Sequence, residues 1–224
     1  MIWPTIIVDD FFDEPQKILE ISKKINFNSS PHGNWPGERS EEISKINIEL
    51  FNWINYRLIR ILYPMNHERM SWTSSQYFQK IDGNIHKHEG WVHSDNPFEI
   101  TAIIYLSNHK KCGTSLFNKK NFFNETKHNN KKKEMYLNKN NINKYLKYLR
   151  ENNDQFEESL SIDSKFNRLV MFDSNQPHAA QSFGNKDNEN EDRLTYIIFF
   201  NSIEIQGIKY PLTEMRRKIF YSFK

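Results

Sequence analysis

Four segments of the chain combine β-branched and aromatic residues in short runs, a composition that fits the pleated, half-buried surface of a strand. They span residues 72–81 (WTSSQYFQKI), 99–107 (EITAIIYLS), 168–173 (RLVMFD) and 193–201 (RLTYIIFFN). Segment 99–107 is nearly all apolar, which indicates a strand buried on both faces or at the centre of a sheet. The chain is therefore expected to fold around a β-rich core.

The N-terminal part of the chain predicts helices that pack against this sheet. After a short strand over residues 2–8, Asp13 is the expected N-terminal cap of a first helix, and residues 27–40 predict a loop. Ser40 is the expected cap of a long amphipathic helix that ends at Pro64. Helices followed by several strands predict an α+β, mainly β fold, an antiparallel sandwich or jelly roll supported by N-terminal helices.

Residues 118–160 interrupt the strand pattern with a stretch dominated by Asn, Lys and Glu. The basic run at residues 131–133 predicts a solvated surface, and apolar residues between Ile142 and Leu149 predict one helix. The stretch lacks the apolar residues for a core of its own. It is therefore interpreted as an insertion between two core strands and as a candidate lid, within a single domain over residues 1–224.

Composition excludes several classes of protein. The 224 residues suffice for one domain with a buried core, and 31 basic against 28 acidic residues are too balanced to favour a nucleic-acid or membrane partner. The single cysteine, Cys112, excludes an internal disulfide and fits a reducing compartment. With no signal sequence and no apolar run of about 20 residues, a soluble cytoplasmic protein is expected. High Asn and Lys content indicates an AT-rich genome, such as that of a bacterium or phage.

A His-x-Asp pair just before the most apolar strand points to a metal site. Side chains two apart in an extended segment share a face, so His93 and Asp95 present an imidazole and a carboxylate together. His178, at a later strand–turn junction, adds a second imidazole. Two imidazoles and one carboxylate leave part of a metal open, and this set suits non-haem Fe(II). Each residue alone fits an ordinary polar position, but the three together favour a metal site.

Arg193 and Thr195 open the last apolar strand and share one of its faces. A cation that begins such a strand needs a partner, and the planar fork of arginine matches a carboxylate. We interpret Arg193, with Thr195 beside it, as the anchor of a carboxylate of 2-oxoglutarate; the alternative is an arginine at a strand edge that faces water. Tyr105 has two open interpretations, a hydroxyl that contacts the same carboxylate or plain core packing.

The other reactive side chains give weaker signals. His86 and His88 are expected at the surface or on the substrate side, because the metal site needs no third histidine. A nucleophilic role for Cys112 has no support, since nothing in the sequence argues for a depressed thiol pKa. The sequence contains no phosphate-binding glycine motif and no zinc-type cysteine cluster.

Several segments together resemble the core of the 2-oxoglutarate/Fe(II) oxygenase superfamily, most of all its prolyl-hydroxylase-like branch. They are HSDNP, TAIIYL, GTSLF, FDSNQPHAAQSF and RLTYIIFF. In addition, VDDFFDEP, WPGERS and NRLVMFD resemble a bacterial and phage family of unknown function, DUF6445. The resemblance implies a double-stranded β-helix (jelly-roll or cupin-like) core. It implies that His93, Asp95 and His178 are ligands of Fe(II). It also implies that Arg193, Thr195 and Tyr105 contact 2-oxoglutarate.

The resemblance also implies a dioxygenase that uses Fe(II), 2-oxoglutarate and O₂ and releases succinate and CO₂. Asp95 at the carboxylate position indicates hydroxylation, of a small molecule or of a peptide or protein side chain. Trp35 and Arg39, in the WPGERS segment, are the candidate substrate contacts. Two alternatives are a non-catalytic jelly-roll module that binds a metal or ligand, and a nucleic-acid demethylase. The second would need aromatic and basic residues along a groove.

Overall fold

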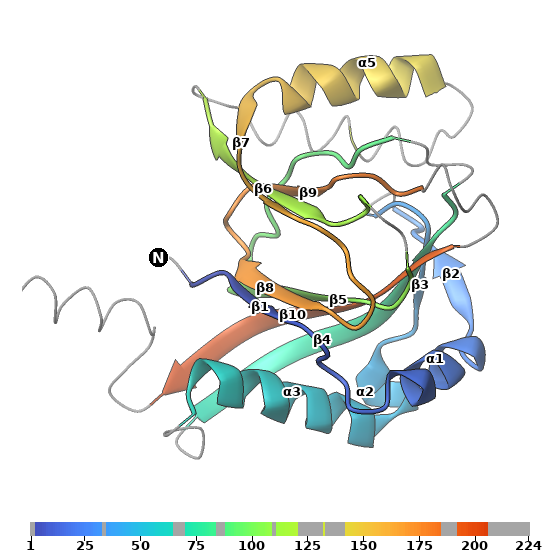
Figure 1. Ribbon diagram of the computed structural model, residues 1–224, viewed down its shortest axis with the longest axis vertical. Coiled ribbons are helices and arrows are strands. Elements are labelled where there is room, and N and C mark those ends of the chain that lie inside the picture. The colour runs from blue at the N-terminus through green and yellow to red at the C-terminus, as the bar shows by residue number, and fades with distance from the viewer. Residues whose placement is uncertain are drawn as a thin grey trace, which may run out of the picture.

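Two antiparallel β-sheets face each other in the computed structural model, with helices on their outer sides (Figure 1). The structure describes residues 3–32, 35–64, 70–83, 88–108, 111–120, 132, 142–184 and 192–205. In spatial order, the large sheet contains β1 (Ile6–Val8), β8 (Leu169–Asp173), β5 (Ile100–Tyr105), β10 (Arg193–Ile205), β4 (Met70–Ile81), β3 (Glu38–Ser40) and β2 (Phe27–Ser29). The small sheet contains β7 (Phe156–Ile162), β6 (Thr114–Lys119) and β9 (His178–Ala180). The predicted α+β, mainly β class is confirmed.

The strand β10 shows how the large sheet serves two purposes. It pairs with β4 on one side and with β5 on the other, so its backbone is central in the sheet. Because side chains alternate along a strand, Tyr196 and Phe200 enter the core beneath the helices, where both are fully buried. Arg193 and Thr195 lie on the opposite face, toward the small sheet. The first set stabilises the fold and the second is available for chemistry.

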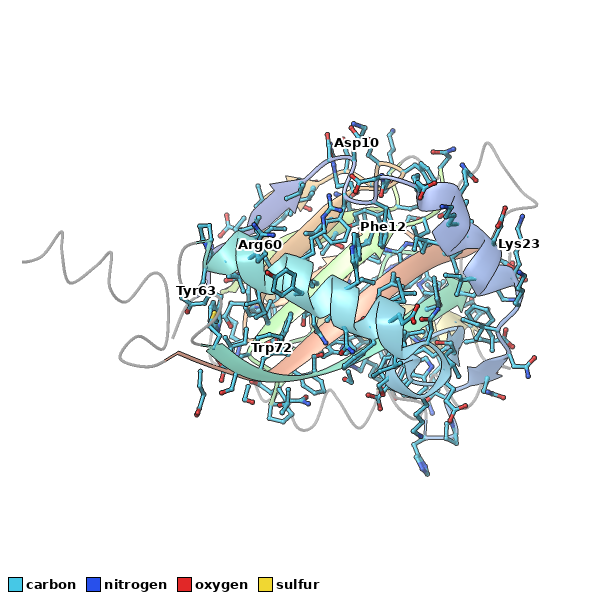
Figure 2. All side chains as sticks on the ribbon, turned by 90° about the horizontal axis from the view of Figure 1, so that it is seen from below. Asp10, Phe12, Lys23, Arg60, Tyr63 and Trp72 are labelled. Carbon is cyan, nitrogen blue, oxygen red and sulfur yellow. The ribbon has the colours of Figure 1, made fainter. Side chains whose placement is uncertain are left out.

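Three helices cover the outer face of the large sheet: α1 (Pro15–Lys23), α2 (Ile43–Ile46) and α3 (Ile48–Leu62). Figure 2 shows α3 lying across the strands. The helix α3 buries Ile54, Leu58 and Ile59 fully against the sheet. Burial of each such side chain contributes about 1.5–3 kcal/mol to the stability of the fold. The interpretation of this apolar stripe as core is confirmed.

The prediction of a loop over residues 27–40 is wrong at both ends of this range. Residues 27–29 and 38–40 form β2 and β3, which pair with each other, and β3 also pairs with β4. Strands of three residues at the edge of a sheet are too short to show an alternating pattern. Their pairing depends on the neighbouring β4 and not on a strong propensity of their own.

Both predicted helix caps are also wrong. The helix α1 begins after Glu14 without a side-chain cap, and Asp13 instead forms an ion pair with Arg57, with Oδ2 3.3 Å from Nη1. Ser40 lies in β3, where its hydroxyl accepts a hydrogen bond from the backbone N–H of Phe78.

The predicted long helix is divided at Asn47 into α2 and α3. The Asn47 side chain caps α3, because its Oδ1 accepts the Leu50 N–H at 3.0 Å. An asparagine inside an apolar periodic stretch is a weak signal in the sequence, since the stripe continues on both sides of it.

The last part of residues 118–160, which were predicted to form an insertion, belongs to the core of the fold. The helix α5 (Ile142–Asn153) confirms the predicted helix, but the next strand, β7, pairs along β6 and belongs to the small sheet. The strand was missed because its side chains between Phe156 and Ile162 are exposed and mostly polar. Lys132 is buried, contrary to the prediction of a solvated basic run. The other two lysines of that run lie outside the described residues.

Replacing Asn47 with Ala is expected to lower the free energy of unfolding by about 1 kcal/mol, because the Leu50 N–H loses its acceptor. Chemical denaturation measures the change. Asn52 is exposed on the same helix, and Asn52→Ala is the matched control, with an expected change below about 0.5 kcal/mol. Equal losses in the two variants would contradict the assignment of the cap.

Candidate metal centre

A pair of backbone hydrogen bonds brings the two predicted histidine ligands together. The His93 N–H donates to the His178 carbonyl oxygen at 3.0 Å, and the His178 N–H donates to the His93 carbonyl oxygen at 2.8 Å. This isolated antiparallel bridge attaches the His93 segment to β9. The Asp95 N–H also donates to the Ser174 carbonyl oxygen at 2.8 Å. Because residues directly opposite in an antiparallel pair project to the same face, both imidazoles point into the space between the sheets.

The three side chains present nitrogen and oxygen atoms to a common point. His93 Nε2 lies 3.4 Å from Asp95 Oδ1, His178 Nε2 lies 3.1 Å from Asp95 Oδ2, and the three ligand atoms lie within 4.8 Å of one another. His93 Nδ1 lies 2.7 Å from the Trp91 carbonyl oxygen, and His178 Nδ1 lies 2.9 Å from that of Gln176. A carbonyl oxygen only accepts, so Nδ1 carries the proton in each ring and Nε2 offers its lone pair to a metal.

The electrostatic environment favours the protonation states that a divalent metal needs. Burial lowers the pKa of His93 to about 4, and the positive charge of Lys132 acts in the same direction. For Asp95, burial alone would raise the pKa, but the neighbouring His178 and His93 hold it well below its usual range. A neutral imidazole and an ionised carboxylate are the forms that coordinate a divalent metal.

Two buried hydroxyl groups orient the Asp95 carboxylate. Thr101 Oγ1 donates to Asp95 Oδ2 at 2.8 Å and lies 2.9 Å from Ser174 Oγ. Because the Thr101 proton points to Asp95, the Ser174 hydroxyl donates to Thr101. Neither residue is predicted from the sequence. The only signal for Thr101 is that it shares the inward face of β5 with Tyr105, and Ser174 gives none.

The helix α5 supports the segment that leads into His93. Asn152 Nδ2 donates to the Val92 carbonyl oxygen, Asn153 Nδ2 donates to that of Gly90, and the Val92 N–H donates to Asn153 Oδ1, each at 3.0 Å. Helix α5 therefore holds the backbone immediately before the first predicted ligand. Its predicted function as a lid stays a prediction.

Arg193 is buried, with 5% of its surface exposed, and it lines the same cavity as the three predicted metal ligands. Its Nε donates to the Cys112 carbonyl oxygen at 3.1 Å, and its guanidinium lies 5.7 Å from the centroid of the Tyr105 ring. No carboxylate of the described residues forms an ion pair with it. The alternative of a strand-edge arginine that faces water does not fit this burial.

Thr195 and Tyr105 lie beside Arg193 and face each other across β10 and β5. Thr195 Oγ1 is buried and has no hydrogen-bond partner in the described part of the chain, and the Tyr105 hydroxyl lies 2.7 Å from Thr114 Oγ1. A buried cation next to an unpartnered hydroxyl fits the carboxylate of a bound ligand. The structure brings all three predicted residues together, and their contact with 2-oxoglutarate stays a prediction.

A cavity of about 680 Å³ lies between the sheets, within the range of about 300–1,000 Å³ typical of small-molecule sites. His93, Asp95, His178 and Arg193 all line it. The predicted substrate residues Trp35 and Arg39 line the same cavity. Lys132 lines it too, and nothing in its basic run distinguishes it from the lysines on either side.

The remaining candidates lie apart from the ligand cluster. The His88 ring packs 4.6 Å from the Tyr145 ring and 5.8 Å from the Phe183 ring, which agrees with the prediction that it is not a ligand. His86 lies outside the described residues. Cys112 is buried, and this burial raises the pKa of its thiol, which disfavours a nucleophile.

Several solved structures share this fold. HygX from Streptomyces hygroscopicus, with nickel and 2-oxoglutarate bound, matches 88% of this chain and 82% of its own, at 9% identity and a TM-score of 0.54. A 2OG-Fe(II) family oxidoreductase from Burkholderia pseudomallei matches 88% and 84%, at 11% identity and a TM-score of 0.54. SnoN, the epimerase from nogalamycin biosynthesis, matches 91% and 81%, at 8% identity and a TM-score of 0.53. The predicted double-stranded β-helix fold is confirmed.

The family model described as "Family of unknown function (DUF6445)" matches residues 3–200, so the chain belongs to this family, as the sequence predicts. A search of curated proteins finds no match. The assignment to the prolyl-hydroxylase-like branch stays a prediction. Within the described part of the chain, every helix is too short or too polar to span a bilayer.

Replacing Thr101 with Val is expected to weaken metal binding about tenfold, because Asp95 loses the donor that orients its carboxylate. Calorimetric titration with Ni(II), a redox-stable substitute for Fe(II), measures the affinity. Thr73, exposed on β4, provides the matched control, and Thr73→Val should leave the affinity unchanged. If Thr101→Val binds Ni(II) with the same affinity as the wild type, the hydroxyl groups of Thr101 and Ser174 have no function in metal binding.

Proposed function

We propose that the protein is an Fe(II)- and 2-oxoglutarate-dependent dioxygenase that hydroxylates its substrate. One observation carries the proposal: the cluster of His93, Asp95 and His178 shares a cavity with a buried arginine, Arg193, that has no carboxylate partner among the described residues. A metal site and a carboxylate anchor in one cavity are the two elements that this chemistry needs. HygX, which has the same fold, binds nickel and 2-oxoglutarate and supports this choice.

The metal would be held by Nε2 of both histidines and one oxygen of Asp95. These three ligands would leave coordination positions for a chelating co-substrate and O₂. When bound, Fe(II) with 2-oxoglutarate and O₂ supplies the oxidant, and succinate and CO₂ are the co-products. The presence of Asp95 favours hydroxylation over halogenation, which needs space for a chloride ion at this position.

The distal carboxylate of 2-oxoglutarate would bind to Arg193, Thr195 and Tyr105. The free N–H groups of the Arg193 guanidinium form a two-pronged contact, and Thr195 Oγ1 gains the partner that it lacks. Burial raises the pKa of Tyr105, so its hydroxyl keeps its proton. That hydroxyl then donates to the carboxylate while it accepts a hydrogen bond from Thr114.

The wild type is expected to form succinate slowly without substrate when Fe(II), 2-oxoglutarate, ascorbate and air are supplied. In Arg193→Gln, the 2-oxoglutarate concentration for half-maximal rate should rise about tenfold or more, because a charged hydrogen bond worth about 1.5–3 kcal/mol is lost. Succinate is measured by mass spectrometry. Arg57→Gln is the matched control, since Arg57 packs against Phe11 on the helix side of the large sheet.

Asp95→Ala separates the two candidate functions in the same assay. An oxygenase loses succinate formation in this variant, because the metal loses its anionic ligand. A non-catalytic binding module would bind Ni(II) and 2-oxoglutarate in the wild type and form no succinate in either protein. That second result would contradict the proposed function while leaving the metal site intact.

A further inference from the structure

Arg39 presents a second guanidinium to the cavity, and it contacts different residues from Arg193. Its guanidinium carbon lies 4.4 Å from the centroid of the Trp35 ring, 5.5 Å from that of Phe199 and 5.9 Å from that of Tyr77. Three aromatic rings therefore surround the charge. The 2-oxoglutarate anchor proposed above does not use this group.

The polar atoms of Arg39 and Trp35 are poorly satisfied. The Arg39 Nη2 donates to Gln79 Oε1 at a long 3.4 Å, while Nε of Arg39 and Nε1 of Trp35 are buried with no hydrogen-bond partner among the described residues. Gln79 is held in place by its own bond to the Pro36 carbonyl oxygen. A buried donor without an acceptor costs about 1–3 kcal/mol, so these two N–H groups favour a bound acceptor.

Arg39 forms no ion pair with any carboxylate in the described part of the chain. The only acidic side chain in the described cavity lining is Asp95, a predicted metal ligand, whose charge acts on Arg39 without forming an ion pair. Burial lowers the pKa of Arg39 to about 10, so the side chain remains protonated at neutral pH. The cavity therefore offers a second guanidinium charge in addition to Arg193, and Lys132 lines the same cavity.

The sheet register places this charge toward the metal end of the cavity. Arg39 lies opposite Gln79 in β4, and Gln79 lies opposite Thr195 in β10. From this row the Arg39 side chain extends toward Phe199, which lies further along β10, away from Arg193. Phe199 is opposite Thr101, the residue that orients Asp95. The Arg39 guanidinium thus lies in the cavity on the side of the predicted metal ligands, where the charge of Asp95 acts on it.

We propose that Arg39 and Trp35 bind a carboxylate group of the substrate, so that the enzyme acts on carboxylic acids. This inference rests on the proposed function. A carboxylate that approaches side-on accepts from Nε–H and one Nη–H of the guanidinium, and the indole N–H of Trp35 adds a third donor. Phe98, stacked 4.8 Å from Phe199, extends an aromatic wall beside this position for an apolar part of the same molecule.

The test uses two small probes of nearly the same shape, benzoate and benzamide, of which only benzoate carries a charge and two acceptor oxygens. The protein is loaded with Ni(II) and 2-oxoglutarate, so the carboxylate site at Arg193 is already filled. Calorimetry or ligand-observed NMR then measures saturable binding of each probe. Benzoate is expected to bind at least about tenfold more tightly than benzamide, the effect of one charge-assisted interaction.

Variants of Arg39 test whether this residue causes the preference for benzoate over benzamide. Arg39→Gln should lose at least about tenfold in benzoate affinity, and Arg39→Lys should recover part of it, because the charge returns without the planar fork. Benzamide affinity and 2-oxoglutarate affinity should change less than about threefold. Arg57→Gln, the matched control on α3, should bind benzoate as the wild type does, and thermal unfolding checks that each variant is folded.

Several results would overturn the inference. They are no saturable benzoate binding, equal affinity for benzoate and benzamide, or a benzoate affinity that does not depend on Arg39. Tighter binding of phenyl phosphate than of benzoate would assign the group to phosphate and not to carboxylate. Failure of the proposed function is distinguishable, because it would appear as a wild type that forms no succinate or does not take up Ni(II) and 2-oxoglutarate, whereas this test measures only the binding of benzoate.

Discussion

The two backbone hydrogen bonds between His93 and His178 are the interaction on which the candidate site depends. They attach an irregular segment to the edge of the small sheet and set two imidazoles side by side, with ring centroids 4.6 Å apart. Asp95 follows in the same segment and is fixed by its own backbone bond to Ser174. Loss of this pairing would separate the ligands even if every side chain remained. Metal affinity therefore depends on the fold of the two sheets, supported by α5 through Asn152.

The cavity has an unusual balance of charge for the interior of a small domain. Arg193 and Arg39 are both directed into it, and in the described lining only the Asp95 carboxylate opposes them. Buried charges without partners are costly, so their presence argues for ligands that bring negative charge. The anion expected at Arg193 is 2-oxoglutarate, the proposed co-substrate. By the same reasoning, an anionic group of the substrate is expected at Arg39. A neutral substrate would bring no negative charge to Arg39, and in the described lining only Asp95, a predicted metal ligand, would oppose it.

The parts of the molecule that the sequence predicted well are those whose own residues determine them. The strands β5, β8 and β10 are apolar enough to be buried, and the spacing of His93 and Asp95 directs both to one side. The strands β2, β3 and β7 were missed because they are short or polar and owe their pairing to neighbours. Thr101 and Lys132 were missed for a related reason: only the tertiary structure brings them to the ligands.

The most direct test of the central claim is an anaerobic titration of the metal-free protein with Fe(II) and 2-oxoglutarate, in the wild type and in His178→Ala. Chelation of Fe(II) by 2-oxoglutarate gives a weak visible charge-transfer band. The account predicts a band in the wild type that requires both additions and is absent from the folded His178→Ala protein. No band in a folded wild-type protein, or an equal band in the variant, would contradict the assignment of this cluster as the metal centre.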